Sequence, residues 1–334
     1  MTRKTVIILI ILLFNFSCVK EKPFKIPEGQ TELALFAENY PEDSLKVSVS
    51  LAQTMGHYPP YQINEPIKVS LFEDDNLLQE KNAKIYGGKY INIDYYGIAN
   101  FDNEILKEGN RYKIMVSNPG YDDIEAETTK PVSVKIKSLT WKHIEGKMPE
   151  WYFDVYGSYE AQNPMGQTVD YTHMIEFSIT FDDPPENNFY QCGIHYLNYN
   201  YFNVAEYKLQ YASFGWPDPL YTIVNYSTLL PTGGLQPGKA NEIIFEDKGF
   251  NGEEKTVKLV IPSREIITSS YEYIIKLYSL SEDHYRYIVS EWLYNRSKDD
   301  PFAEPVDFYS NVNNETGMFA IASCDFDTII VNEK

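Results

Sequence analysis

The chain has 334 residues, of which 48 are acidic and 29 basic, so its formal net charge is −19. A protein this acidic repels phosphate backbones, which argues against nucleic-acid binding. Aromatic residues make up 15% of the chain and include 28 Tyr, a residue common on half-exposed sheet faces and on binding surfaces.

The first residues follow the order of a bacterial lipoprotein signal. Arg3 and Lys4 precede the apolar run Val6–Phe14, which is about half the length of a membrane-spanning helix. Ser17 then supplies a small residue and Cys18 a thiol, as expected before and after the cleavage point of a lipidated secretory protein. We therefore expect Cys18 to be the lipidated first residue of a membrane-tethered chain. Cleavage would remove residues 1–17, which contain Arg3 and Lys4, and would change the net charge from −19 to −21. A secreted protein with a chance cysteine is the alternative.

Beyond a polar tether at residues 18–30, apolar and polar residues alternate with the period of β-strands. Turn residues separate about seven short strands, at the spacing of a sandwich. We predict an immunoglobulin-like β-sandwich over residues 31–135. Its clearest strands are Val47–Leu51, Ile67–Leu71, Tyr112–Val116 and Val132–Ile136, and a tight glycine hairpin is expected at Ile85–Tyr90.

Residues 136–334 are predicted to form a second, larger β-sandwich, which makes the chain mainly β. The expected strands are Trp151–Tyr156, Met174–Phe181, Glu242–Phe245, Thr256–Ile261, Tyr271–Leu280 and Met318–Ala322. One amphipathic helix is expected near residues 281–297, because Ser281 is a good N-cap and an apolar face follows it. That face comprises Tyr285, Ile288, Val289 and Trp292. We expect it to pack on a sheet; a binding groove is the alternative.

An aromatic-rich insertion spans residues 189–226, with 12 aromatic residues in 38. Its loop carries Phe214, Trp216 and Tyr221 beside glycine and prolines, which disfavour a strand interior. Together with Tyr58 and Tyr61 in an earlier proline loop, these residues are the candidates for ligand or partner binding. The alternative is that the rings fill the second core.

Two cysteines, Cys192 and Cys324, remain once Cys18 is lipidated. In an oxidising compartment they could form one disulfide. Two buried free thiols are the alternative, because the sequence contains no distance between them.

Motifs for nucleotide binding, zinc proteolysis and serine hydrolysis do not occur in the sequence. The five histidines are scattered, with no pair at metal-ligand spacing; they are His57, His143, His173, His195 and His284. The short acidic runs lack EF-hand spacing and are expected to be solvated turns. We therefore expect no catalytic residue, no metal and no cofactor. A hydrolase that uses two distant carboxylates is a further alternative.

The C-terminal third resembles a known family. Leu277–Ser281 leads into the helix, and Asp300–Val306, Ser310–Val312 and Gly317–Phe319 follow. These segments are similar to the Bacteroidetes-type outer-membrane lipoprotein family catalogued as domain of unknown function 4249. The family usually has a glycine turn where Asn314–Thr316 stands in this chain.

Weaker likeness lies earlier in the chain. Phe181–Pro184 with Asn188–Tyr190, and Phe245–Asp247 with Phe250–Gly252, resemble strand-and-turn segments of the family. Residues 191–240 match nothing recognisable.

The resemblance implies an outer-membrane lipoprotein found beside TonB-dependent transporters, and it implies no catalytic residue. We expect a non-enzymatic accessory or ligand-binding module, held to the membrane by its lipid, with a TonB-dependent transporter as partner. Its small-molecule or peptide ligand and the membrane face stay open. A fimbrillin-like structural or adhesive protein is the second reading, and an unpaired strand edge at residues 31–36 would favour it.

Overall fold

The computed structural model shows a mainly β protein with three sheets, which confirms the predicted fold class. The structure describes residues 32–52, 66–88, 93–145, 173–199, 207–211, 224–225, 242–263, 271–297, 304 and 306–332. Within these ranges one α-helix occurs, α3 (Glu282–Ser297). No helix in the described part is long and apolar enough to cross a membrane.

Two sheets form the first sandwich. One face is built in the order β1-β2-β6-β5 and the other in the order β4-β3-β7-β8. The strands are β1 (Glu32–Asn39), β2 (Leu45–Ala52), β3 (Lys68–Glu73), β4 (Asn76–Asn82), β5 (Lys84–Gly88), β6 (Ile93–Phe101), β7 (Arg111–Ser117) and β8 (Ile124–Thr129). A short 3₁₀ turn, Asn103–Ile105, leads from β6 towards β7.

Period-2 alternation explains why these segments form strands around one core. In β2 and β3, Val47, Val49, Val69 and Leu71 are fully buried because every second side chain of a strand points to the same face. The strand order is compatible with the immunoglobulin-like arrangement. A ninth strand from the far end of the chain joins this sandwich, so the immunoglobulin-like detail stays a prediction, as does the boundary at residue 135.

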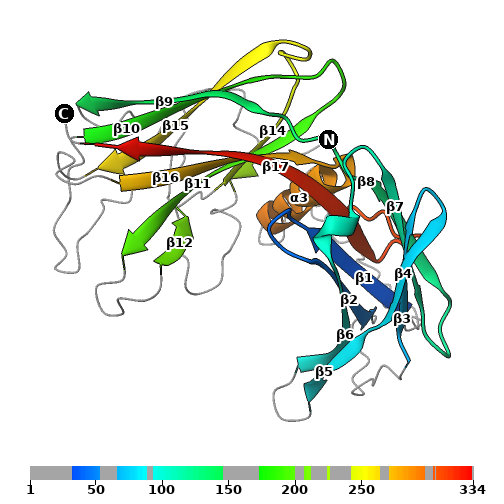
Figure 1. Cartoon of the computed structure of the whole chain (residues 1–334). Coiled ribbons are helices and arrows are strands. Elements are labelled where there is room, and N and C mark those ends of the chain that lie inside the picture. Colours follow the sequence, from blue (N-terminus) through cyan, green and yellow to red (C-terminus); the bar gives the residue numbers. More distant parts are fainter. Residues whose placement is uncertain are drawn as a thin grey trace, which may run out of the picture. The chain divides into compact units, whose positions relative to one another are not determined.

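The second sandwich packs a three-stranded sheet, β15-β10-β9, against β14, β11, β16 and β17 (Figure 1). Its inner rings include Phe177, Phe181, Tyr190 and Phe245. The strands are β9 (Ile136–Glu145), β10 (His173–Asp182), β11 (Phe189–Tyr199), β12 (Tyr207–Tyr211), β13 (Val224–Asn225), β14 (Glu242–Glu246), β15 (Glu254–Ser263), β16 (Tyr271–Leu280) and β17 (Gly317–Val331).

Strand β17 belongs to both sandwiches. Its first part pairs in parallel with β1, and from Ala322 onward it pairs antiparallel with β16. Phe319 and Ile321 therefore complete the first core, whereas Val331 lies in the second. The result is one ten-stranded sheet that continues from one core to the other.

This pairing also places β1 inside the sheet. From Leu35 to Glu38 the strand is bonded to β17 on one side and to β2 on the other. Nearer its start, the carbonyl of Leu33 accepts the side-chain amide of Asn314 at 2.7 Å. Of the edge expected at residues 31–36, Leu35 and Phe36 are thus paired on both sides, whereas the register with β17 does not extend to Glu32–Ala34. The strand-exchanging subunit stays an alternative.

Several local predictions need correction. The run Val132–Ile136 is not a strand of the first sandwich: Val132 is 63% exposed and β9 begins only at Ile136. Pro131, just before this run, has no N–H to donate to a ladder. The glycines expected to form a tight hairpin turn lie within β5, where the register shifts between Tyr86 and Gly88. Trp151–Tyr156 lies outside the described residues.

Candidate functional site

Helix α3 packs on the sheet that contains β14, β16 and β17. It lies on the face of that sheet that points away from the second core. The hydroxyl of Ser281 accepts the N–H of His284 at 3.3 Å, which caps the helix start. Tyr285 and Ile288 are buried against Tyr278 and Ala322 of the sheet. The predicted helix and its packing on a sheet are confirmed; the side chain of Trp292 lies outside the described residues.

The first turn of α3 is tied to both neighbouring segments. The two carboxylate oxygens of Asp283 accept the hydroxyl of Thr128 on β8 and that of Tyr309, each at 2.7 Å. The first bond ties the helix to the first sandwich and the second ties it to the segment that follows the helix, so its first turn is held from two sides.

A polar group links the end of β1 to the helix. Nε2 of His284 lies 2.7 Å from a carboxylate oxygen of Glu38, and the hydroxyl of Tyr40 lies 3.4 Å from the same nitrogen. Burial opposes ionisation of Glu38, but the hydrogen bond and charge of His284 outweigh it, so the pKa of Glu38 is held below its ordinary value. His284 is fully buried, so its contact with Glu38 holds the end of β1 to the helix.

Glu42 forms a second polar link between the sandwiches. Its carboxylate accepts Lys276 Nζ at 2.6 Å and the Tyr278 hydroxyl at 2.9 Å. Burial acts against the charged form, yet Lys276 dominates in combination with the other donors and lowers the pKa of Glu42. Glu42 lies in the turn between β1 and β2, so these bonds tie that turn to β16.

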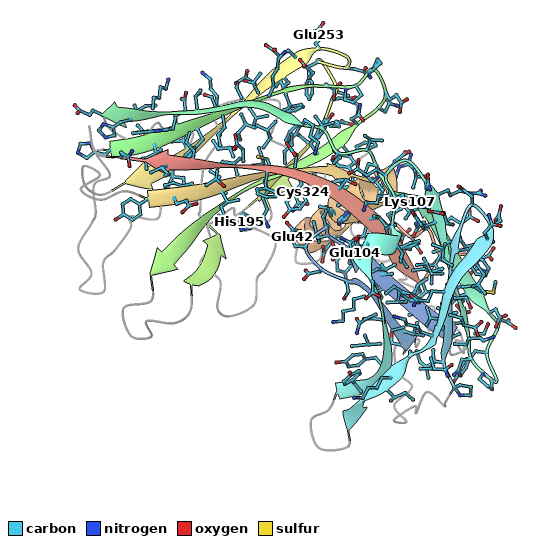
Figure 2. All side chains as sticks on the ribbon, viewed as in Figure 1. Glu42, Glu104, Lys107, His195, Glu253 and Cys324 are labelled. Carbon is cyan, nitrogen blue, oxygen red and sulfur yellow. The ribbon has the colours of Figure 1, made fainter. Side chains whose placement is uncertain are left out.

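Cys324 and His195 lie near this link, on β17 and β11 (Figure 2). Burial, helped by the negative charge of Glu42, raises the pKa of the Cys324 thiol to about 12. Burial and the positive charge of Lys276 lower the pKa of His195 to about 4. A cysteine nucleophile needs the opposite, a depressed thiol pKa beside a proton-accepting imidazole. The proton therefore stays on the sulfur of Cys324. The strand registers place Cys324 level with Gln191, four residues along β11 from His195, so the thiol and the imidazole are not neighbours.

An open hollow of about 340 Å³ lies beside the polar group of β1. It is lined by Glu38, Tyr40, Asp43, Ser44, Lys46 and Asn100. Both acids and the lysine face solvent, where water screens them. The hollow is suited to part of a contact surface better than to an enclosed ligand pocket.

A row of aromatic rings crosses the outer surface beside the hollow, and we call it the α3 face: Phe36, Tyr287, Tyr294 and Phe308. Tyr287 meets Phe36 edge-on at 6.4 Å between ring centroids and Phe308 at 6.2 Å, and Phe308 contacts Tyr294 at 4.5 Å. Phe36 and Phe308 are 43% and 44% exposed. Contiguous aromatic area therefore faces solvent here.

The α3 face has an acidic border. Burial, together with the negative charge of Glu38, raises the pKa of Glu291 on the helix. Two carboxylates thus lie near each other beside exposed rings. A protein surface with a basic group among apolar side chains would complement this arrangement.

Most binding residues expected from the sequence lie outside the described residues: Cys18, Tyr58, Tyr61, Phe214, Trp216 and Tyr221. The part of the aromatic-rich insertion that is described forms β11, β12 and β13. There Tyr190 fills the second core, whereas Phe189 stacks on Tyr285 of α3 at 4.7 Å. These two rings follow the alternative that the insertion serves packing.

The disulfide considered for Cys192 and Cys324 is not formed, and both cysteines keep their thiols. Cys192 pairs with Leu277 of β16 and faces the core, whereas Cys324 pairs with Tyr278 on the far side of that strand and faces the helix. With β16 between them, their backbones are two strand spacings apart, about 10 Å, which exceeds the reach of a disulfide.

Sequence reasoning missed the α3 face. It identified the buried stripe of the helix but not the exposed rings, because Phe36 and Phe308 are far from the helix in sequence and only tertiary packing joins them. The alternation of β1, in which Phe36 and Glu38 fall on the polar side, was the available signal.

It also missed a histidine pair. His143 and His173 are not at ligand spacing along the chain, yet their Nε2 and Nδ1 atoms lie 3.0 Å apart across β9 and β10.

A buried pair of acids occupies the turns that resemble the family. Asp183 accepts the hydroxyl of Tyr190 and the N–H of Gly252, the latter at 2.8 Å, and Asp247 accepts the N–H of Asn188 at 2.8 Å. Burial raises the pKa of Asp183 despite these bonds. Each carboxylate is buried and bonded to a neighbouring turn, so the two acids hold together the turns at the end of the second sandwich.

The family motif of the C-terminal segment is likewise structural. The side chain of Asn311 donates to the carbonyls of Glu127 and Phe319, each at 2.8 Å, and accepts the N–H of Phe319 at 2.9 Å. It thereby joins β8 to β17 through three bonds.

Comparison with known proteins agrees with the resemblance seen in the sequence. A family model described as "Domain of unknown function (DUF4249)" matches residues 21–325. No curated protein matches the chain. Since the match spans nearly all of the two sandwiches, the chain belongs to the family catalogued as domain of unknown function 4249.

Proposed function

We propose that this protein is a lipid-anchored, non-enzymatic accessory of the outer membrane that docks on a TonB-dependent transporter through the α3 face. The observation that carries the docking role is the row of exposed, mutually contacting rings on α3 and β1.

The proposed location rests on the order of the first residues. A charged start, a short apolar run and a small residue before Cys18 fit a lipoprotein signal. The family resemblance of the C-terminal third supports the outer membrane and the transporter as partner class.

The α3 face supports docking because aromatic residues dominate the energetics of protein interfaces. Its rings are already held by ring–ring contacts and by a helix fixed through Asp283, so little side-chain freedom is lost on binding. The acidic border of Glu38 and Glu291 adds a charge preference for a basic partner surface.

A non-enzymatic role is supported by the buried surroundings of Cys324 and His195, which also lie apart on β17 and β11. The pKa of Cys324 is raised to about 12 and that of His195 is lowered to about 4, opposite to what nucleophilic catalysis needs. The buried acids Asp183 and Asp247 are occupied by turn hydrogen bonds.

The test is co-purification from outer membranes of the native host under mild detergent, with the full chain carrying a C-terminal tag. The wild type is expected to bring down a TonB-dependent transporter, identified by mass spectrometry. The double variant Tyr294→Ala with Phe308→Ala is expected to lose most of it, since it removes the exposed end of the row.

Phe326→Ala is the matched control, because Phe326 on β17 is an even more exposed ring outside the α3 face. A Cys18→Ser variant should lose the lipid and leave the membrane fraction. Absence of any TonB-dependent transporter from the wild-type eluate would refute the docking proposal, and retention of Cys18→Ser in the membrane would refute the anchor.

A further inference from the structure

The second sandwich carries a site of a different kind, which goes beyond the proposed docking function. His143 and Glu145 lie two residues apart on β9, and His173 starts β10 directly opposite Glu145. Residues two apart on a strand share a face, and so do opposed residues of an antiparallel pair. All three side chains therefore project from one face, where β9 ends and β10 begins (Figure 1).

That face is the one that covers the second core. Ile175, opposite His143, is buried in the core, and Trp141 precedes His143 on the same face of β9. If the inward-facing residues of β9 and β10 served packing alone, apolar residues would be expected at the ends of both strands. Instead these ends carry two half-buried imidazoles and an exposed carboxylate, at the rim of the core where solvent and ions can reach them.

The spacing of these groups suits one metal ion. Nε2 of His143 and Nδ1 of His173 lie 3.0 Å apart, with the rings stacked at 5.0 Å between centroids. One ligand atom from each of the three residues lies within 4.8 Å of the other two. Two nitrogens that each bind Zn²⁺ at about 2.0–2.1 Å are separated by roughly 3–3.5 Å. The imidazoles are thus already at ligand spacing, and Glu145 needs only a side-chain rotation.

The donor types select the class of ion. Two imidazole nitrogens and a carboxylate suit Zn²⁺, Cu²⁺ or Ni²⁺, whereas Ca²⁺ and Mg²⁺ prefer all-oxygen sites. The strongly acidic chain, with a net charge of −19, raises the local concentration of cations.

We propose that His143, His173 and Glu145 bind a divalent transition-metal ion, with Zn²⁺ as its representative. Three protein ligands leave a fourth position open for water or for a donor from a bound partner. If the two histidines only share a hydrogen bond, the protein should not bind Zn²⁺ at this place. If they are ligands, it should bind one ion per chain.

The experiment is a calorimetric titration of the tag-free mature protein with Zn²⁺, with the bound metal counted after dialysis. We expect one Zn²⁺ per chain and an increase in the unfolding temperature on saturation, because the ion binds only the folded site. His143→Gln and His173→Gln should each weaken binding at least about tenfold, and Glu145→Gln by about tenfold or less.

Glu254→Gln is the matched control: it removes one carboxylate from the opposite end of the same three-stranded sheet and should bind Zn²⁺ like the wild type. Circular dichroism establishes that each variant is folded, and Glu145→Gln serves if a histidine variant does not fold. Wild-type protein that retains no Zn²⁺, or folded ligand variants that bind it as tightly as the wild type, would overturn the proposal.

Discussion

Glu315 has a left-handed backbone, with φ of 61°, in the turn that precedes β17. A side chain in this conformation costs about 1 kcal/mol or more, whereas glycine adopts it without that cost. The turn therefore carries local backbone strain at Glu315.

Replacing Glu315 by glycine should raise the free energy of unfolding by about 0.5 kcal/mol, because relief of strain exceeds the extra entropy of glycine in the unfolded chain. Glu315→Ala is the control, since it removes the same carboxylate but keeps the strain. Urea unfolding that finds Glu315→Gly no more stable than Glu315→Ala would contradict this account.

The ionised Glu38 side chain makes the free energy of unfolding depend on pH. Its pKa is lower in the folded protein than its ordinary value, so its contribution is present above about pH 4.5 and is lost as the pH falls through the folded pKa. Its side chain is about half exposed, and its charge disfavours ionisation of nearby Glu291, which keeps the net contribution small.

Glu38→Gln should therefore lower the free energy of unfolding by about 1 kcal/mol near pH 7 and by less near about pH 3.5. Urea unfolding at the two pH values measures the difference. Glu272→Gln, at an exposed position of β16, should be nearly neutral at both. An equal loss for Glu38→Gln at both pH values would contradict the linkage.

At the scale of elements, the strands with strict alternation were predictable from sequence. The predicted strands agree with β2, β3 and β16 at Val47–Leu51, Ile67–Leu71 and Tyr271–Leu280. When one face of a strand is buried, apolar and polar residues alternate along its sequence. The helix was predictable for a similar reason, since its cap and its buried stripe are local.

Other elements had no local signal. Strand β8 uses Ala126 and Thr128 on its buried face, and neither marks a core strand by composition. The second half of β17 exposes Phe326 and Ile330, which obscures its pattern. The parallel pairing of β1 with β17 joins opposite ends of the chain, and no residue pattern encodes such a partner.

Site residues were predictable only where they are neighbours along the chain. The buried stripe of α3 was predictable because its residues are neighbours on one helix. The α3 face and the histidine pair depend on tertiary contacts between distant segments, as in Phe36 with Tyr287 and His143 with His173, so spacing along the chain could not indicate them.

The junction of β17 with β1 depends on Gly317. A Cβ there would collide with the backbone carbonyl of Leu35, and φ is 119°. Gly317→Ala should lower the free energy of unfolding by at least about 3 kcal/mol, because it strains the turn and separates the paired strands.

Gly120→Ala is the matched control for this prediction: φ is also positive, at 96°, but an added Cβ meets nothing within 4 Å. It should cost about 1 kcal/mol, from backbone strain alone. Equal losses for the two glycines in urea unfolding would show that the close approach of Leu35 is unimportant.

At the scale of the whole molecule, sharing β17 couples the two cores. Phe319 is buried in the first core, and Val331 at the end of the same strand is buried in the second. The polar links Glu38–His284 and Glu42–Lys276 reinforce the connection between β1 and the second sandwich.

We therefore expect Phe319→Ala, which should cost about 3–5 kcal/mol, to destabilise both sandwiches together. Hydrogen exchange in rising urea measures this, with peptides from β3 and β7 reporting on the first core and peptides from β10 and β15 on the second. Loss of protection in the first core alone would contradict the coupling.

Site-specific photo-crosslinking in native outer membranes tests whether the α3 face docks on a TonB-dependent transporter, as proposed. With a benzophenone amino acid in place of Phe308, we expect a covalent adduct with a TonB-dependent transporter, and none with the same probe in place of exposed Phe326. If Phe308 gives no transporter adduct, or if both positions give equal adducts, the α3 face is not the docking surface.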